Sequence, residues 1–131
     1  MIGLDTNVIV RHLADDDPVQ SPIAHTCFEN LSPGDPGFIS SVTLVEVHWV
    51  LRQSYRYSRS LVHGAIVRLL STSDLVVEDA DLVRRALAIA AEYERDLPDV
   101  LITEKGLRAG CRETVTFDKK AASLTGMALL E

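Results

Sequence analysis

Aromatic side chains and cysteines are scarce in this sequence of 131 residues. Aromatic residues make up 5% of it against 47% hydrophobic residues overall, so the core has to be mainly aliphatic, which suits packed layers of helices and strands. The two cysteines, Cys27 and Cys111, are far apart and form no CxxC pair. A disulfide framework and a cysteine-based zinc site are therefore not expected, and the two thiols fit a reducing compartment.

Long apolar runs and a basic excess are also missing. No stretch of about 18 apolar residues occurs, so the sequence predicts no membrane span. The first residues lack the basic region and the cleavage site of a signal peptide, and we expect a cytoplasmic protein with no membrane partner. The net charge is −6, so the sequence lacks the excess of basic residues that is usual in nucleic-acid binders. Because bound divalent cations reverse the local potential around acidic ligands, this charge does not exclude RNA.

Short apolar runs alternate with helical patterns along the whole chain. Strands are expected at Ile2–Leu4, Phe38–Ser40, Leu75–Val77, Thr114–Phe117 and Ala128–Leu130. Helices are expected over Val8–Leu13, Ile23–Leu31, Val42–Tyr55, Ser60–Leu70, Asp81–Arg95 and Pro98–Gly110, with a short one over Lys119–Leu124. This alternation predicts an α/β fold, a twisted parallel sheet flanked by helices on both faces. No repeat or linker interrupts it, so residues 1–131 are predicted to form a single domain.

Four carboxylates stand at the predicted ends of these elements. Asp5 and Asp118 follow or end predicted strands, and Glu46 and Asp99 lie near the starts of predicted helices. Since ligands of open parallel sheets bind beyond the carboxyl ends of the strands, all four acids are expected at one end of the molecule. Such a cluster repels itself unless cations lie between its members. Oxygen ligands of this kind suit Mg²⁺ or Mn²⁺.

Each of these acids also has a purely structural explanation. Asp5 fits the N-cap of the helix that follows it, and Asp118 fits the cap of the short helix after it. Thr43 and Glu46 have the spacing of a capping box, and Asp99 suits the first turn of a helix. The neighbours of Glu46 argue against a purely structural role. Val42, Trp49 and Val50, at i−4, i+3 and i+4, form an apolar stripe on which a lone charge is costly.

Four short motifs resemble those of PIN domains, particularly the VapC-type toxins of bacterial toxin–antitoxin pairs. In chain order, the matching segments are Ile2–Val8, Ser40–Glu46, Asp96–Ile102 and Val115–Lys120. Each motif is short, but the four occur in the family's order and the resemblance runs through the whole chain. Pro98 replaces the small residue that is more usual before the third acid, and Ala121 and Ala122 stand where the family often has a phenylalanine.

The resemblance implies a PIN-like fold and a Mg²⁺- or Mn²⁺-dependent endoribonuclease, acting as the toxin of a type II toxin–antitoxin system. It implies Asp5, Glu46 and Asp99 as the principal metal ligands, with Asp118 as a further ligand or as the residue that orients water. Three neighbours are expected to fix the orientation of these carboxylates: Thr6, Asn7 and Thr116. The implied partners are an RNA substrate, a small cognate antitoxin and a second copy of the chain in a homodimer. The alternative is a catalytically inactive PIN-like scaffold that binds RNA or protein.

Other polar residues have less distinctive positions. Six basic residues are candidates for RNA phosphate contacts or for ordinary surface charges: Arg11, Arg52, Arg56, Arg59, Lys119 and Lys120. Tyr55 and Tyr57 suit core or dimer packing better than base stacking. The histidines show neither metal spacing nor a nucleophilic partner and are expected to be structural or surface residues: His12, His25, His48 and His63. A receiver-type module and an Asp-x-Asp phosphatase are disfavoured, because Thr6 and Asn7 follow Asp5 where those proteins need a second acid.

Overall fold

Helices and short parallel strands alternate along the chain in the computed structural model, which describes all residues 1–131. The strands are β1 (Ile2–Gly3), β2 (Gly37–Ile39), β3 (Leu75–Val77), β4 (Thr114–Thr116) and β5 (Met127–Leu129). The α-helices are α1 (Thr6–Ala14), α2 (Gln20–Glu29), α3 (Ser41–Trp49), α4 (Arg59–Leu70), α5 (Ala80–Tyr93) and α6 (Leu97–Arg108). A π-helical turn, η1 (Val50–Ser54), follows α3, and a 3₁₀ turn, η2 (Ala121–Ser123), lies between β4 and β5. The predicted α/β class with parallel strands is confirmed, and no helix is long and apolar enough to cross a lipid bilayer.

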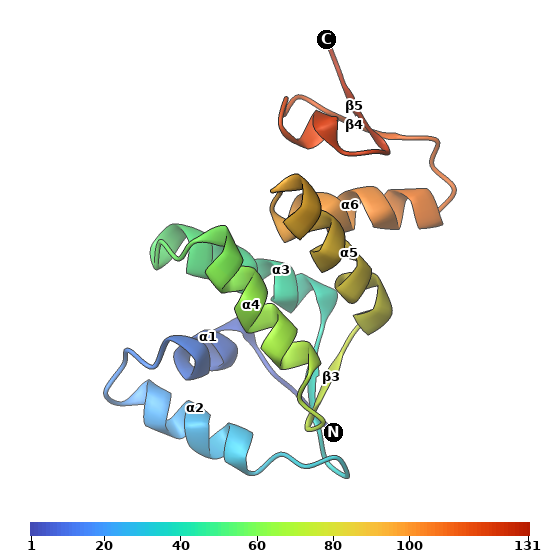
Figure 1. Ribbon diagram of the computed structural model, residues 1–131. Coiled ribbons are helices and arrows are strands. Elements are labelled where there is room, and N and C mark those ends of the chain that lie inside the picture. The colour runs from blue at the N-terminus through green and yellow to red at the C-terminus, as the bar shows by residue number, and fades with distance from the viewer. The chain divides into compact units, whose positions relative to one another are not determined.

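The chain divides into two compact units, Met1–Ala80 and Asp81–Glu131. The first unit holds α1 to α4 and a three-stranded parallel sheet in the order β1-β2-β3. The second unit holds nearly all of α5, the whole of α6 and the two-stranded parallel sheet β4-β5 (Figure 1). The strands therefore form two sheets rather than one, because β4 and β5 pair only with each other. The single domain expected over residues 1–131 stays a prediction.

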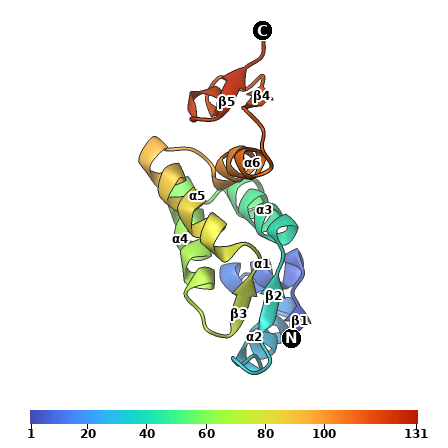
Figure 2. The same cartoon turned by 90° about the vertical axis from the view of Figure 1, so that its right-hand side faces the viewer.

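In the first unit, β2 is the central strand, and β1 and β3 run parallel to it on either side (Figure 2). The register pairs Phe38 with Gly3 on one side and with Val76 on the other. Leu4 extends the β1 ladder by donating its N–H to the carbonyl of Phe38 at 2.9 Å. Because the strands are parallel, their carboxyl ends lie at one edge of the sheet. The chain leaves that edge into α1 after β1 and into α3 after β2.

The core of the first unit is aliphatic, as the composition predicts. Its largest fully buried aliphatic side chains come from α1, β2, α3, η1 and α4: Ile9, Ile39, Leu44, Leu51 and Ile66. Removing a side chain of this size from water stabilises the fold by about 1.5–3 kcal/mol. Helices α1 and α2 form a helical hairpin, and α1 also packs against α3. The starts of α1 and α3 are therefore held at the same edge of the sheet by buried contacts.

The long helix predicted in the middle of the first unit begins and ends differently from the prediction. It begins after Ser40, whose hydroxyl accepts the N–H of Thr43 at 3.1 Å and donates to the hydroxyl of Thr43 at 3.0 Å. The capping box of Thr43 with Glu46 is therefore not formed, because Thr43 lies inside the first turn. The helix then widens into the π turn η1, and the N–H of Tyr55 donates to the carbonyl of Val50 at 3.3 Å.

In the second unit, a glycine lets β5 lie close to α6. Gly126 has a φ of +96°, and a Cβ at this position would lie 2.9 Å from Cγ2 of Thr103 and 3.0 Å from Cδ1 of Leu107. Only glycine adopts this backbone angle without strain and leaves space for the helix. At the other end of α6, Pro98 occupies the first turn, where its missing N–H removes no intrahelical hydrogen bond.

Candidate functional site

Asp5 lies two residues after the end of β1 and occupies the N-cap position of α1. Its backbone is extended, with φ −82° and ψ 161°, and its carbonyl accepts the N–H groups of Val8 and Ile9. Its carboxylate makes no capping hydrogen bond and is exposed. The capping explanation of Asp5 therefore does not hold for its side chain, which is available to another ligand. Of its two neighbours with predicted supporting roles, Thr6 is buried and Asn7 is exposed.

Glu46 lies in the second turn of α3 on a face that solvent reaches. Val42, one turn earlier on the same side, is 79% exposed, whereas Leu44 and Val47 are fully buried. The prediction that Glu46 shares a buried apolar stripe is wrong, because α3 turns a neighbouring face to the core. Since α1 and α3 leave the same sheet edge and pack together, Asp5 and Glu46 belong to adjacent elements.

Asp99 occupies the first turn of α6, where the helix dipole favours a negative side chain. Its carbonyl accepts the hydroxyl of Thr103 at 2.9 Å, and its N–H donates to the carbonyl of Asp96 at 3.2 Å. Asp96 is the N-cap residue but makes no capping hydrogen bond through its side chain. Asp99 is half-buried beside the buried Leu97 and Pro98, so its backbone position is fixed by packing as well as by hydrogen bonds.

Asp118 lies two residues after β4, and its side chain stabilises the turn that leads into η2. Its Oδ1 accepts the N–H of Lys120 at 2.8 Å and that of Ala121 at 3.2 Å, where η2 begins. Its own N–H donates to the hydroxyl of Thr116 at 3.0 Å. The side chain therefore has a structural role in this turn, although the N-cap residue of η2 is Lys120. Only Oδ1 is used, so Oδ2 remains available for a second role.

Arg95 is a residue whose role the sequence did not indicate. Its guanidinium donates to the carbonyl of Lys120 at 2.8 Å and to the hydroxyl of Ser123 at 2.6 and 3.0 Å. It also donates to the carbonyls of Tyr93 and Glu94 at 2.9 and 3.0 Å. Arg95 thus joins the segment that leads into α6 to the turn that follows Asp118. No local pattern marks such a residue, because its partners lie 25 and 28 positions away.

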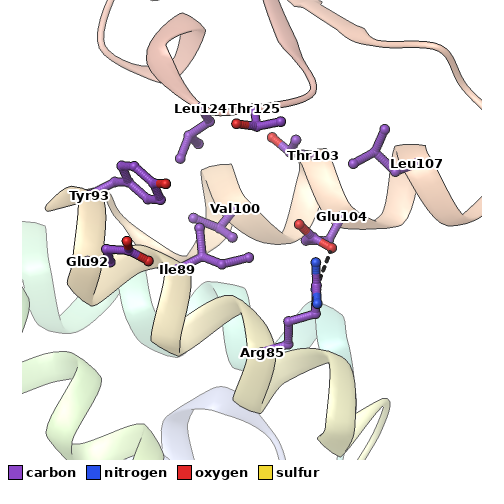
Figure 3. Close-up of a pocket in the computed structure, with 10 residues that line it drawn as sticks. All are labelled: Arg85, Ile89, Glu92, Tyr93, Val100, Thr103, Glu104, Leu107, Leu124 and Thr125. Carbon is purple, nitrogen blue, oxygen red and sulfur yellow. Dashed lines mark hydrogen bonds and ion pairs between the residues drawn. The ribbon is translucent and has the colours of Figure 1, made fainter.

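The predicted acids do not line the cavity in the second unit, which has a volume of about 270 Å³ (Figure 3). Its walls come from α5, α6 and the residues after η2: Arg85, Ile89, Glu92, Tyr93, Val100, Thr103, Glu104, Leu107, Leu124 and Thr125. Across it, Nε of Arg85 donates to Oε2 of Glu104 at 3.1 Å, and the side chain of Glu104 is only 13% exposed. This cavity is therefore a separate feature, whose one largely buried acid is already paired.

The basic candidates for RNA contact differ in how far they are engaged. Arg11 donates to Gln20 at 2.9 Å, to Tyr55 at 3.1 Å and to Asp16 at 3.3 Å, which favours a structural role in the first unit. Lys119 and Lys120 are exposed and adjoin Asp118. This lysine pair is therefore better placed than Arg11 for a phosphate contact.

Within each unit, two of the four predicted acids are tied to neighbouring elements. Asp5 and Glu46 stand on α1 and α3 in the first unit, and Arg95 links the segments that carry Asp99 and Asp118 in the second. The donor atoms are all carboxylate oxygens, the ligands that hard divalent cations prefer. The joining of all four in one site stays a prediction.

Comparison with known proteins places the chain in a family. A family model described as PIN domain matches residues 2–126. Among solved structures, the chain is similar to VapC20 of Mycobacterium tuberculosis, described as a sarcin–ricin loop cleaving toxin, with 20% identity over 94% of each chain and a TM-score of 0.47. A toxin–antitoxin complex from Klebsiella pneumoniae is 21% identical over 97% of this chain and 94% of that chain, with a TM-score of 0.35. No curated protein matches the sequence. Because the family model extends over nearly the whole length, this chain belongs to the PIN domain family.

Proposed function

We propose that this chain is a Mg²⁺- or Mn²⁺-dependent endoribonuclease that hydrolyses RNA phosphodiester bonds at Asp5, Glu46, Asp99 and Asp118. Membership of the PIN domain family supports this activity. The observation that carries the site is the carboxylate of Asp5, which stands at the N-cap of α1 without capping it. A cap of this kind contributes about 1 kcal/mol, so an exposed aspartate that forgoes it fits a residue kept for a ligand.

The acids fit a hard divalent cation in their chemistry. Asp5, Glu46 and Asp99 would hold it through charged oxygens, and Oδ2 of Asp118 would hold it or accept a proton from water. When bound, such an ion activates water at neutral pH and neutralises charge on the phosphate. Thr116 fixes the turn of Asp118 through its hydroxyl, and the neighbouring lysines would contact the RNA backbone.

Charge-removing substitutions test the site. Asp5→Asn, Glu46→Gln and Asp99→Asn should each abolish RNA cleavage while the circular dichroism spectrum stays unchanged, because each amide keeps the shape of the side chain without its charge. Asp81→Asn is the matched control, since the side chain of Asp81 is 99% exposed in an ion pair at the surface. Full activity in one site variant removes that residue from the site, and full activity in all three refutes the proposal.

Metal removal distinguishes this function from the inactive scaffold. Cleavage should stop in a chelator and return with Mg²⁺ or Mn²⁺, whereas Zn²⁺ need not restore it, because the ligand set contains neither histidine nor cysteine. A scaffold shows no cleavage and no rise in melting temperature with Mg²⁺ or Mn²⁺. Cleavage that survives exhaustive chelation points to a metal-free mechanism instead.

We further propose that the chain is the toxin of a type II pair and that a small antitoxin binds beside the acids. An acidic cluster accepts an arginine or lysine side chain, and exposed apolar residues such as Val42 on the same face of α3 suit an amphipathic segment. Expression of the chain alone should arrest growth, and co-expression with its small neighbouring open reading frame should relieve the arrest, with the two proteins co-purifying. Harmless expression of a chain that cleaves RNA in vitro contradicts the toxin role alone. The predicted homodimer is tested by light scattering.

A further inference from the structure

Two histidines face each other across the α1–α2 hairpin. His12 lies in the last turn of α1 and His25 in α2, and their Nδ1 atoms are 2.8 Å apart. The ring centroids are 4.9 Å apart and the ring planes make an angle of 70°, so the rings meet by their edges rather than by stacking. Both side chains line a cavity of about 460 Å³ that also borders Glu29 and Asp74. The nitrogens therefore lie beside a space that can admit an ion and water.

The carboxylate of Asp15 determines which nitrogen of His25 can bind a metal ion. Nε2 of His25 lies 2.8 Å from Oδ1 of Asp15. Because a carboxylate only accepts hydrogen bonds, Nε2 of His25 carries a hydrogen, and in the singly protonated ring the lone pair on Nδ1 points to Nδ1 of His12, where a metal ion would have to replace the shared proton. Asp15 is the C-cap residue of α1 and has a left-handed backbone conformation, with a φ of 49°. Its N–H donates a hydrogen bond to the carbonyl of Arg11. Histidines that bind metal ions usually donate their other ring N–H to a carboxylate in this way.

The ring of His12 is held in place by stacking. It lies parallel to the ring of Phe28, with 3.8 Å between centroids and 4° between planes. The stack on Phe28 therefore holds the His12 ring in one orientation beside the cavity.

We propose that His12 and His25 bind one divalent late transition metal ion, Ni²⁺ or Cu²⁺, through their Nδ1 atoms, with Asp15 orienting His25. Two nitrogens bound to one ion at about 2.0 Å lie about 2.8 Å apart at a right angle, and about 3.3 Å apart at the tetrahedral angle. The observed separation matches the right angle of square-planar or octahedral sites. Imidazole nitrogen suits these ions, whereas Mg²⁺ prefers oxygen, so this site is distinct from the acidic one.

Calorimetric titration of the full chain, prepared without a histidine tag, tests the site with NiCl₂ and CuCl₂. One ion per chain should bind, and His12→Gln or His25→Gln should weaken binding at least tenfold. Asp15→Asn should weaken it by about 10–100-fold, the usual effect of removing a carboxylate behind a ligand. Asp16→Asn is the matched control, because it removes the same charge one position along and pairs with Arg11 at 3.3 Å instead. Equal affinity in the wild type and both histidine variants overturns the proposal.

A second measurement needs no variant. In nitrogen-detected NMR of the wild type, the ring signals of His12 and His25 should broaden first at substoichiometric Ni²⁺ and be untouched by Mg²⁺. If the short Nδ1–Nδ1 contact only shares a proton, Ni²⁺ leaves both signals unchanged, and the proposal fails. Cleavage of RNA with Mg²⁺ should persist in His25→Gln, so failure of this site and failure of the proposed nuclease give different results.

Discussion

Arg95 makes the most testable long-range connection in the second unit. Replacing it by alanine removes the hydrogen bonds to Lys120 and Ser123, which join segments more than 20 positions apart, and those to the adjacent carbonyls of Tyr93 and Glu94. Hydrogen bonds to a charged group contribute about 1.5–3 kcal/mol when well shielded, and less where water can replace them. Because this guanidinium is partly exposed, we expect a net loss of about 1–3 kcal/mol in the free energy of unfolding. That corresponds to a fall in melting temperature of about 4–10 °C for a chain of this size.

The assay is urea unfolding followed by circular dichroism, with RNA cleavage measured on the folded fraction. Arg112→Ala is the matched control, because the side chain of Arg112 is 90% exposed and its only ion pair spans 4.0 Å; it should change stability by less than about 0.5 kcal/mol. A double-mutant cycle of Arg95→Ala with Ser123→Ala should give a coupling of about 0.5–2 kcal/mol. If Arg95→Ala behaves like Arg112→Ala, or if the coupling is zero, the assigned connection to the turn of Asp118 is wrong.

Three further predictions concern local structure. Gly126→Ala should lower the free energy of unfolding by about 1–3 kcal/mol, because the new Cβ meets α6 and the backbone angle is strained; thermal melting measures this. Ser40→Ala should cost about 1 kcal/mol through the lost cap of α3, while Thr43→Ala, inside the first turn, should cost less; equal losses would contradict the observed cap. Burial and His25 lower the folded-state pKa of His12 below its usual value. On acidification, the unfolded chain therefore takes up a proton at a higher pH than the folded chain, and the free energy of unfolding should fall as the pH drops below about 6.5. The melting temperature of His12→Gln should fall less over this range, and parallel curves would refute the assignment.

The order of helices and strands is predictable from the sequence because each element is short and clearly patterned. Leu75–Val77 forms a strand with the predicted bounds, and the predicted helix over Ser60–Leu70 begins only one residue earlier. The buried face of α3 is not predictable in the same way. This helix has apolar residues on nearly every side, so its pattern does not decide whether Val42 or Leu44 faces the core. The pattern therefore predicts a helix here, but it predicts the wrong environment for Glu46.

The positions of the candidate acids are partly predictable for a related reason. Asp5 and Asp118 each follow a short apolar run, so their places after β1 and β4 are visible in the sequence. Whether the side chain of such an aspartate binds backbone N–H groups is decided by the local backbone, and the two residues differ: Asp118 holds the turn before η2, while Asp5 makes no capping hydrogen bond to α1. The pairing of His12 with His25 depends on how α1 packs against α2, and the separation of 13 positions in the sequence does not indicate it.

The shortness of the strands determines where the chain resists amide hydrogen exchange. No strand has more than three residues, and only β2 has a hydrogen-bonded neighbour on both sides. The slowest exchange should therefore come from helices with fully buried side chains, such as α3 and α4 around Val47 and Val62. The two-stranded β4-β5 ladder, with Val115 55% and Phe117 beside it 79% exposed, belongs to the class of structure that opens locally at small free-energy cost. Asp118 lies two residues after β4, so the exchange rates of the β4-β5 amides with and without Mg²⁺ report how far a bound cation orders that part of the chain.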